Sequence, residues 1–250
     1  MPNYLVILTF DGSDFHGWQT QPELRTVQET CEQAVATLFE PGINVTAAGR
    51  TDAGVHAIGM PANFKTIKMR EPHVVKRALN GLLARDVRVT DCRIVPDDFS
   101  ARFKARSRAY RYLMETAFVA DPLTRRYAWQ APVELHLESM QGALADLVGE
   151  HDFSSFRASD CASISPVRRM LSARMTELGD GKVELFFEAT GFLKHMVRSI
   201  VGTLVEIGKG DRPPEDMREL LAHPDRSSVG RTAPPQGLFF IYARYPESLE

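Results

Sequence analysis

The pattern of apolar and polar residues divides the chain into two similar series of strands and helices. Residues 4–10, YLVILTF, are rich in β-forming residues and end at DGSD, a turn signal. Apolar residues at 27, 31, 34, 35 and 38 have the spacing of one helix face. The first half thus predicts strand, helix, strand, strand, helix and strand over residues 4–10, 26–40, 43–49, 60–66, 73–83 and 87–95.

The second half predicts the same order of elements. A strand at 107–116 and a helix at 138–149 come first, followed by two strands, 166–178 and 182–190, joined by a GDG turn. A long helix at 192–208 and a closing strand at 237–245 complete the series, with an extra short helix at 214–223. The simplest fold is α+β, with two ferredoxin-like (βαββαβ) halves whose antiparallel sheets lie side by side and form a central cleft. We expect the boundary near 97–105, giving halves 1–104 and 105–250.

Composition is that of an ordinary globular protein. The 250 residues are 44% hydrophobic, and 30 basic against 32 acidic residues give a net charge of −2, so any nucleic-acid surface must be a local patch. Three widely spaced cysteines without a C-x-x-C motif favour a reducing compartment. The N-terminus predicts a strand rather than a signal peptide, and no apolar run reaches the ~18 residues of a membrane span. We therefore expect a cytoplasmic protein.

The stretch AAGRTDAGVHA, residues 47–57, is the first candidate for chemistry. Asp52 stands between glycines after a predicted strand, with Arg50 as its one charged neighbour. Such an aspartate is often a turn former that accepts local hydrogen bonds. The glycines and the strand edge favour a second interpretation, in which a carboxylate acts as nucleophile, base or electrostatic stabiliser in a cleft.

Arg198 is the second candidate, on the predicted helix 192–208. It lies away from the centre of that helix's apolar face, as solvated helix charges usually do. Ser199 and Gly202 beside it are small, so another segment can approach that flank closely. An arginine there is suited to a forked pair with a carboxylate, which would hold the carboxylate ionised and oriented.

The segment ARFKARSRAYRY, residues 101–112, holds five cations and no acid. Strand alternation places Arg106, Arg108, Tyr110 and Tyr112 on one face. A polar outer face is the common explanation for one strand. The functional explanation is a phosphate-binding track that ends in aromatic rings able to stack on a base.

The segment FDGSDFHGWQ, residues 10–19, carries Asp11, Asp14 and His16, but no matching ligand cluster accompanies them, so a metal site is not expected. The segment is better interpreted as a loop that presents Phe15 and Trp18. The chain also lacks a P-loop, G-x-G-x-x-G, G-x-S-x-G and H-E-x-x-H motif, so no cofactor is expected.

Several motifs in register resemble one family. GRTDAGVHA resembles the signature of the tRNA pseudouridine synthase A (TruA) family. Other segments that match the family in order and separation are at 10–21, 26–28 (TVQ), 106–112 (RSRAYRY), 191–208 and 232–238 (TAPPQGL). The resemblance therefore extends over nearly the whole chain.

This resemblance implies an isomerase that converts uridine to pseudouridine at nucleotides 38, 39 and 40 of the tRNA anticodon stem-loop. It places the catalytic aspartate at Asp52, its paired arginine at Arg198, the active-site tyrosine at Tyr110 and the arginine that helps the target base leave the stack at Arg50. It also implies two ferredoxin-like halves, a homodimer, and no metal or cofactor. The first half would carry the Asp52 loop; the second would carry the Arg198 helix and the RNA-binding strand.

Two other functions compete with this one. A non-catalytic RNA-binding module would use aromatic residues on a ferredoxin-like sheet, as RRM-type domains do, but would leave Asp52 and Arg198 unexplained. An aspartate-dependent hydrolase of a nucleoside or sugar would need a second, protonated carboxyl group near Asp52, and the motif offers none.

Overall fold

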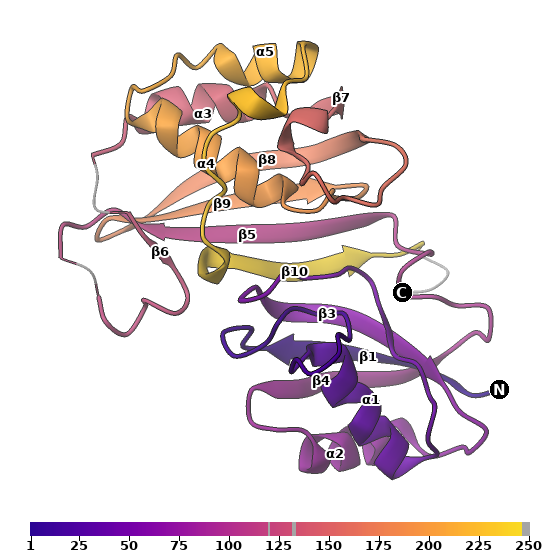
Figure 1. Ribbon diagram of the computed structural model, residues 1–250. Coiled ribbons are helices and arrows are strands. Elements are labelled where there is room, and N and C mark those ends of the chain that lie inside the picture. Colours follow the sequence, from indigo (N-terminus) through magenta and orange to yellow (C-terminus); the bar gives the residue numbers. More distant parts are fainter. Residues whose placement is uncertain (120, 132–133, 247–250) are drawn as a thin grey trace. The chain divides into compact units, whose positions relative to one another are not determined.

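The computed structural model describes residues 1–119, 121–131 and 134–246 (Figure 1). Its fold is α+β. Contacts divide the chain into two compact units, Met1–Arg108 with Phe239–Glu250, and Ala109–Leu238. Positions 120, 132–133 and 247–250 of the predicted second half lie outside the described residues.

The first unit contains six elements in the predicted order: β1 (Asn3–Phe10), α1 (Val27–Leu38), β2 (Thr46–Ala47), β3 (His56–Lys65), α2 (Pro72–Leu82) and β4 (Val87–Val95). β1 lies between β4 and β3, and β2 pairs with the other edge of β3. All these pairs are antiparallel, which is consistent with the expected βαββαβ arrangement. β10 (Leu238–Arg244) then runs parallel to β3, with Phe239 opposite His56.

Local sequence explains the two helices of this unit. Thr26 caps α1 by accepting a hydrogen bond from the amide of Glu29, and α2 begins at a proline, whose fixed φ suits a first turn. The predicted apolar face of α1 is the buried one, with Val27, Cys31, Ala34 and Val35 inside the core. The helices lie beside each other, and α2 packs on β4 (Figure 1).

The second unit contains β6 (Trp129–Gln130), α3 (Leu137–Ala145), β7 (Gly149–Asp152), β8 (Val167–Gly179), β9 (Lys182–Ala189), α4 (Met196–Gly208) and α5 (Asp216–Ala222), together with most of β5 (Ser107–Glu115). The strands lie in the order β5, β9, β8, β7. β8 and β9 form the predicted hairpin over Asp180 and Gly181, both at positive φ. α3 packs against both α4 and β8 (Figure 1).

Several elements differ from the sequence prediction. β3 begins at His56 rather than at 60, and the short strands β6 and β7 were not predicted. α4 begins at Met196 rather than 192, because His195 has a left-handed backbone with φ 64° that ends the preceding turn. β2 has two residues where 43–49 was predicted. The closing strand was predicted as part of the second half. From Phe239 onward it belongs to the first compact unit instead.

Candidate active site

Asp52 lies on the loop between β2 and β3, and a second loop holds that loop in place. We call residues 11–18 the clamp loop. The amide of Trp18 donates to the Thr51 carbonyl at 3.0 Å, and the amide of Gly54 donates to the Phe15 carbonyl at 3.2 Å. The Asp52 main chain is therefore tied to the clamp loop on both sides, while its side chain stays half-buried.

Two glycines let the clamp loop come this close. Gly17 has φ +89°, and a Cβ there would lie 2.7 Å from the Thr51 carbonyl oxygen. A Cβ on Gly12 would overlap the Val55 carbonyl oxygen. Any larger residue at either place has to displace the backbone next to Asp52. Gly54, which follows Asp52 by two residues, also has a positive φ of 77°, so glycines are needed in both loops.

His56 is a buried residue that also contacts the clamp loop. It is 2% exposed, and its ring stacks on Phe239 with centroids 4.7 Å apart. Its Nδ1 accepts a hydrogen bond from the Gly12 amide at 3.0 Å and lies 3.2 Å from Asp11 Oδ1. A ring nitrogen that accepts from Gly12 carries no proton to give to Asp11, so Nδ1 hydrogen-bonds only one of the two at a time. His56 was not among the predicted site residues, although it follows Asp52 by four residues at the start of β3.

Arg106 and Arg108 of the predicted phosphate-binding track differ in exposure and in their contacts. Arg106 is exposed. The guanidinium of Arg108 donates to three main-chain carbonyls: Ala48 at 3.1 Å, Ala105 at 3.2 Å and Arg102. It thus joins the turn at 102–105 to the segment leading into the Asp52 loop. Arg50, on that loop, is exposed and makes no hydrogen bond or ion pair with any described residue.

Arg198 belongs to the second unit and is held by the segment after α5. Its Nε donates to the Ala233 carbonyl at 2.8 Å, and the Ala233 amide donates to the Arg198 carbonyl at 3.0 Å. A Cβ on Gly202 would overlap the Arg231 carbonyl oxygen. The prediction that a small-residue flank admits another segment beside Arg198 is confirmed.

The two tyrosines of the track are buried. Tyr110 is 8% exposed and meets the Phe192 ring edge-on, with centroids 5.0 Å apart. Tyr112 is fully buried and donates its hydroxyl to the Pro234 carbonyl at 2.8 Å. Burial raises the pKa of Tyr112 well above the usual range, against the opposing effect of Arg198. The interpretation of Tyr112 as an open stacking surface was therefore wrong, because tertiary packing covers its ring.

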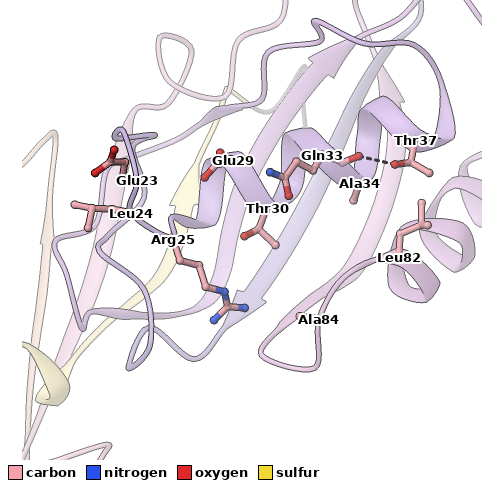
Figure 2. Close-up of a pocket in the computed structure, with 10 residues that line it drawn as sticks. All are labelled: Glu23, Leu24, Arg25, Glu29, Thr30, Gln33, Ala34, Thr37, Leu82 and Ala84. Atoms are coloured by element: carbon pink, nitrogen blue, oxygen red, sulfur yellow. Dashed lines mark hydrogen bonds between the residues drawn. The ribbon is translucent and has the colours of Figure 1, made fainter.

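A hollow of about 590 Å³ beside α1 contains none of the predicted site residues (Figure 2). Its lining includes Glu23, Glu29, Gln33 and Arg25. The Arg25 guanidinium is already engaged, through two hydrogen bonds to Asp86 of 2.7 and 3.0 Å and a contact over the Phe15 ring. This hollow therefore offers no unpaired cation and no cluster that resembles the predicted chemistry.

Within the described parts of the chain, no three His, Cys, Asp or Glu residues are grouped as metal ligands. Among the same residues, no helix has the length and apolar character required to cross a membrane.

Of the six predicted site residues, Arg50, Asp52, Arg106 and Arg108 lie in the first unit, and Tyr110 and Arg198 lie in the second. The pairing of Asp52 with Arg198 stays a prediction.

Comparison with known proteins identifies the family. A family model described as tRNA pseudouridine synthase matches residues 6–104 and 143–246. The chain belongs to the tRNA pseudouridine synthase family. Members of this family are isomerases that act on uridine in tRNA, and the resemblance found in the sequence motifs is thereby confirmed.

Individual tRNA pseudouridine synthases match over nearly their full length. The protein named tRNA pseudouridine synthase A from Geobacter sp. (strain M21) is 43% identical over 248 residues, covering 99% of this chain and 100% of its own. That from Geotalea uraniireducens (strain Rf4) is 41% identical over 240 residues, covering 96% and 98%. Among solved structures, a Cbf5-Nop10-Gar1 complex matches at 10% identity with a TM-score of 0.37, over 94% of this chain and 57% of that one, a likeness too weak to support any argument.

Proposed function

We propose that this protein converts uridine to pseudouridine at nucleotides 38, 39 and 40 in the anticodon stem-loop of tRNA. The observation that carries the proposal is the match, over almost the entire chain, to relatives named tRNA pseudouridine synthase A. The chain carries the aspartate, arginine and tyrosine motifs in the order that the resemblance requires.

In this proposal Asp52 is the catalytic carboxylate. The reaction breaks the C–N glycosidic bond, rotates the uracil and forms a C–C bond, so nothing is oxidised and no atom is added. Attack on the base, attack on the sugar and abstraction of a sugar proton all require a carboxylate in contact with one nucleotide. The clamp loop supports this role, because main-chain hydrogen bonds on both sides of Asp52 fix its position before the substrate arrives.

The target nucleotide must leave its stack, at a cost of a few kcal/mol. Arg50 is the residue proposed to fill the vacated space, and its exposed guanidinium without a protein partner among the described residues suits that task. Tyr110 is proposed to contact the flipped base, and Arg198 to pair with Asp52. Arg106 and Arg108 are proposed to follow the RNA backbone, Arg108 in part through the turn that its guanidinium anchors.

The remaining features of the proposal come from the resemblance. They are catalysis without metal or cofactor, a homodimer, a cytoplasmic location, and ferredoxin-like halves at 1–104 and 105–250. Sedimentation equilibrium tests the homodimer directly, since one chain has a mass of 28.0 kDa.

Tritium release tests the activity. A tRNA transcript labelled at uridine C5 loses tritium when the new bond forms at C5, and no free uracil appears. An RNA-binding module would release neither tritium nor uracil, and a hydrolase would release uracil. Transcripts in which cytidine replaces uridine at 38, 39 and 40, singly and together, test the positions. Tritium release from the triply replaced transcript at the normal rate would contradict the assignment to these nucleotides.

A further inference from the structure

The turn that follows β4 presents an aromatic ring to solvent on a rigid base. Phe103 is 78% exposed. Two residues earlier, Ala101 is fully buried, accepts a hydrogen bond from the Tyr245 hydroxyl at 2.8 Å and donates its amide to Asn63 Oδ1 at 2.8 Å. Ala101 and Tyr245 belong to one core cluster with Phe99. The ring therefore projects from a turn whose base is fixed in the core.

The charges around this ring are unbalanced. The Arg102 guanidinium carbon lies 5.2 Å from the centre of the Phe103 ring, within cation–π range. Lys104 is paired with Asp98 at 2.7 Å. Arg102 and Arg106 have no carboxylate partner among the described residues. In a chain of net charge −2, this turn is a local concentration of unneutralised positive charge.

Arg108 connects this turn to the loop of the candidate active site. One guanidinium hydrogen-bonds the carbonyls of Arg102 and Ala105 in the turn and the carbonyl of Ala48. Ala48 precedes Arg50 by two residues, and Arg50 is also exposed and without a protein partner in the described chain. The guanidinium of Arg108 therefore holds the turn and the segment that leads to Arg50 close to each other.

We propose that Phe103 and Arg102 form a stacking platform for a nucleotide of the bound tRNA that lies outside the catalytic pocket. This inference rests on the proposed function, which makes tRNA the partner. RNA fits the surface because it supplies both phosphates for the unpaired arginines and base faces for the ring. A protein partner fits poorly, because Phe103 is flanked in the chain by the cations Arg102 and Lys104, and charged residues are depleted at the centre of protein–protein interfaces.

Equilibrium binding of unmodified tRNA at several salt concentrations tests the platform. Phe103→Ala is expected to weaken binding about tenfold, the usual effect of losing one base–aromatic stack. Phe103→Tyr is expected to bind as wild type does, because it keeps the ring. The slope of log affinity against log salt should be unchanged in Phe103→Ala and shallower by about one in Arg106→Ala, which removes a phosphate contact.

Two controls make the outcome specific. Phe118→Ala removes another highly exposed phenylalanine, and Arg85→Ala removes an exposed arginine after α2; both should bind tRNA as wild type does. The platform is overturned if Phe103→Ala binds within twofold of wild type, if Phe103→Tyr is as weak as Phe103→Ala, or if Phe118→Ala is equally weakened. Tritium release by the wild-type protein tests the proposed function and is measured separately. A protein that releases tritium but binds tRNA equally well as Phe103→Ala would contradict the platform alone.

Discussion

Arg198 and Ala233 are joined by two hydrogen bonds, one through the arginine side chain and one through its main-chain carbonyl. The side-chain bond uses Nε and has a length of 2.8 Å. Ala233 is itself buried, and the segment before it packs against Gly202, where no side chain fits. The guanidinium is therefore oriented by its neighbours before any substrate binds.

Arg198→Lys is expected to lower turnover about ten- to a hundredfold while leaving tRNA affinity within twofold. A lysine ammonium keeps the charge but cannot reproduce a planar group fixed through Nε. Single-turnover tritium release gives the rate, and filter binding gives the affinity. Arg218→Lys, at an exposed arginine of α5, is the matched control and should have wild-type turnover. Equal rates for Arg198→Lys and wild type would show that the orientation of this guanidinium is unimportant.

Asp52→Asn is expected to bind tRNA normally and to lose turnover by at least about a thousandfold, as expected when a catalytic carboxylate is removed. The amide is nearly isosteric, so the main-chain bonds between Thr51, Gly54 and the clamp loop should persist. Tritium release and gel-shift titration on the same preparation separate the two effects. Substantial residual turnover would remove Asp52 from the chemistry.

Gly17→Ala tests whether the clamp loop positions Asp52. Gly17 and Gly42 have similar positive φ, +89° and +83°, so alanine costs about 1–2 kcal/mol of backbone strain at either place. The Cβ at Gly17 meets the Thr51 carbonyl and Asp52, whereas the Cβ at Gly42 meets nothing within 4 Å. We expect Gly17→Ala to lower kcat about tenfold or more, beyond any shared loss of stability.

Gly42→Ala is the control for that strain, and its kcat should equal that of wild type. Thermal unfolding of both variants, followed by circular dichroism, measures the stability change. If the two variants lose stability equally and both keep full turnover, the clamp loop does not determine the position of Asp52.

Thiol reactivity should distinguish the three cysteines. Burial raises the pKa of Cys31 to about 12, with Glu32 adding to the effect, and burial raises that of Cys92 to about 12, with Asp91 adding and Lys76 opposing. At pH 8, about one such thiol in 10,000 is the reactive thiolate. We therefore expect one fast-reacting thiol, Cys161, when the folded protein meets a disulfide reagent at pH 8. The fast phase should disappear in Cys161→Ser and persist in Cys92→Ser; the reverse would contradict the assignment.

Local sequence patterns were sufficient to predict most of the helices and strands and to identify the family. The apolar face of α1, the β8–β9 hairpin over Asp180 and Gly181, and the small residue that admits a segment beside Arg198 follow from patterns within a few residues of one another. Helix periodicity could not place the start of α4, because the left-handed backbone at His195 depends on what surrounds the turn.

The sequence by itself determined which residues are candidates for chemistry, since Asp52, Arg198 and the basic segment at 101–112 are recognisable from residue type and spacing. Tertiary structure decided what each of them contacts. It covered Tyr112 and exposed Phe103, engaged Arg108 with main-chain carbonyls, and brought Gly12 and Gly17 against the Asp52 loop. The physical reason is that the exposure and the hydrogen-bond partners of a side chain depend on segments distant in the chain. The pattern of residues along one strand or helix contains no information about those segments.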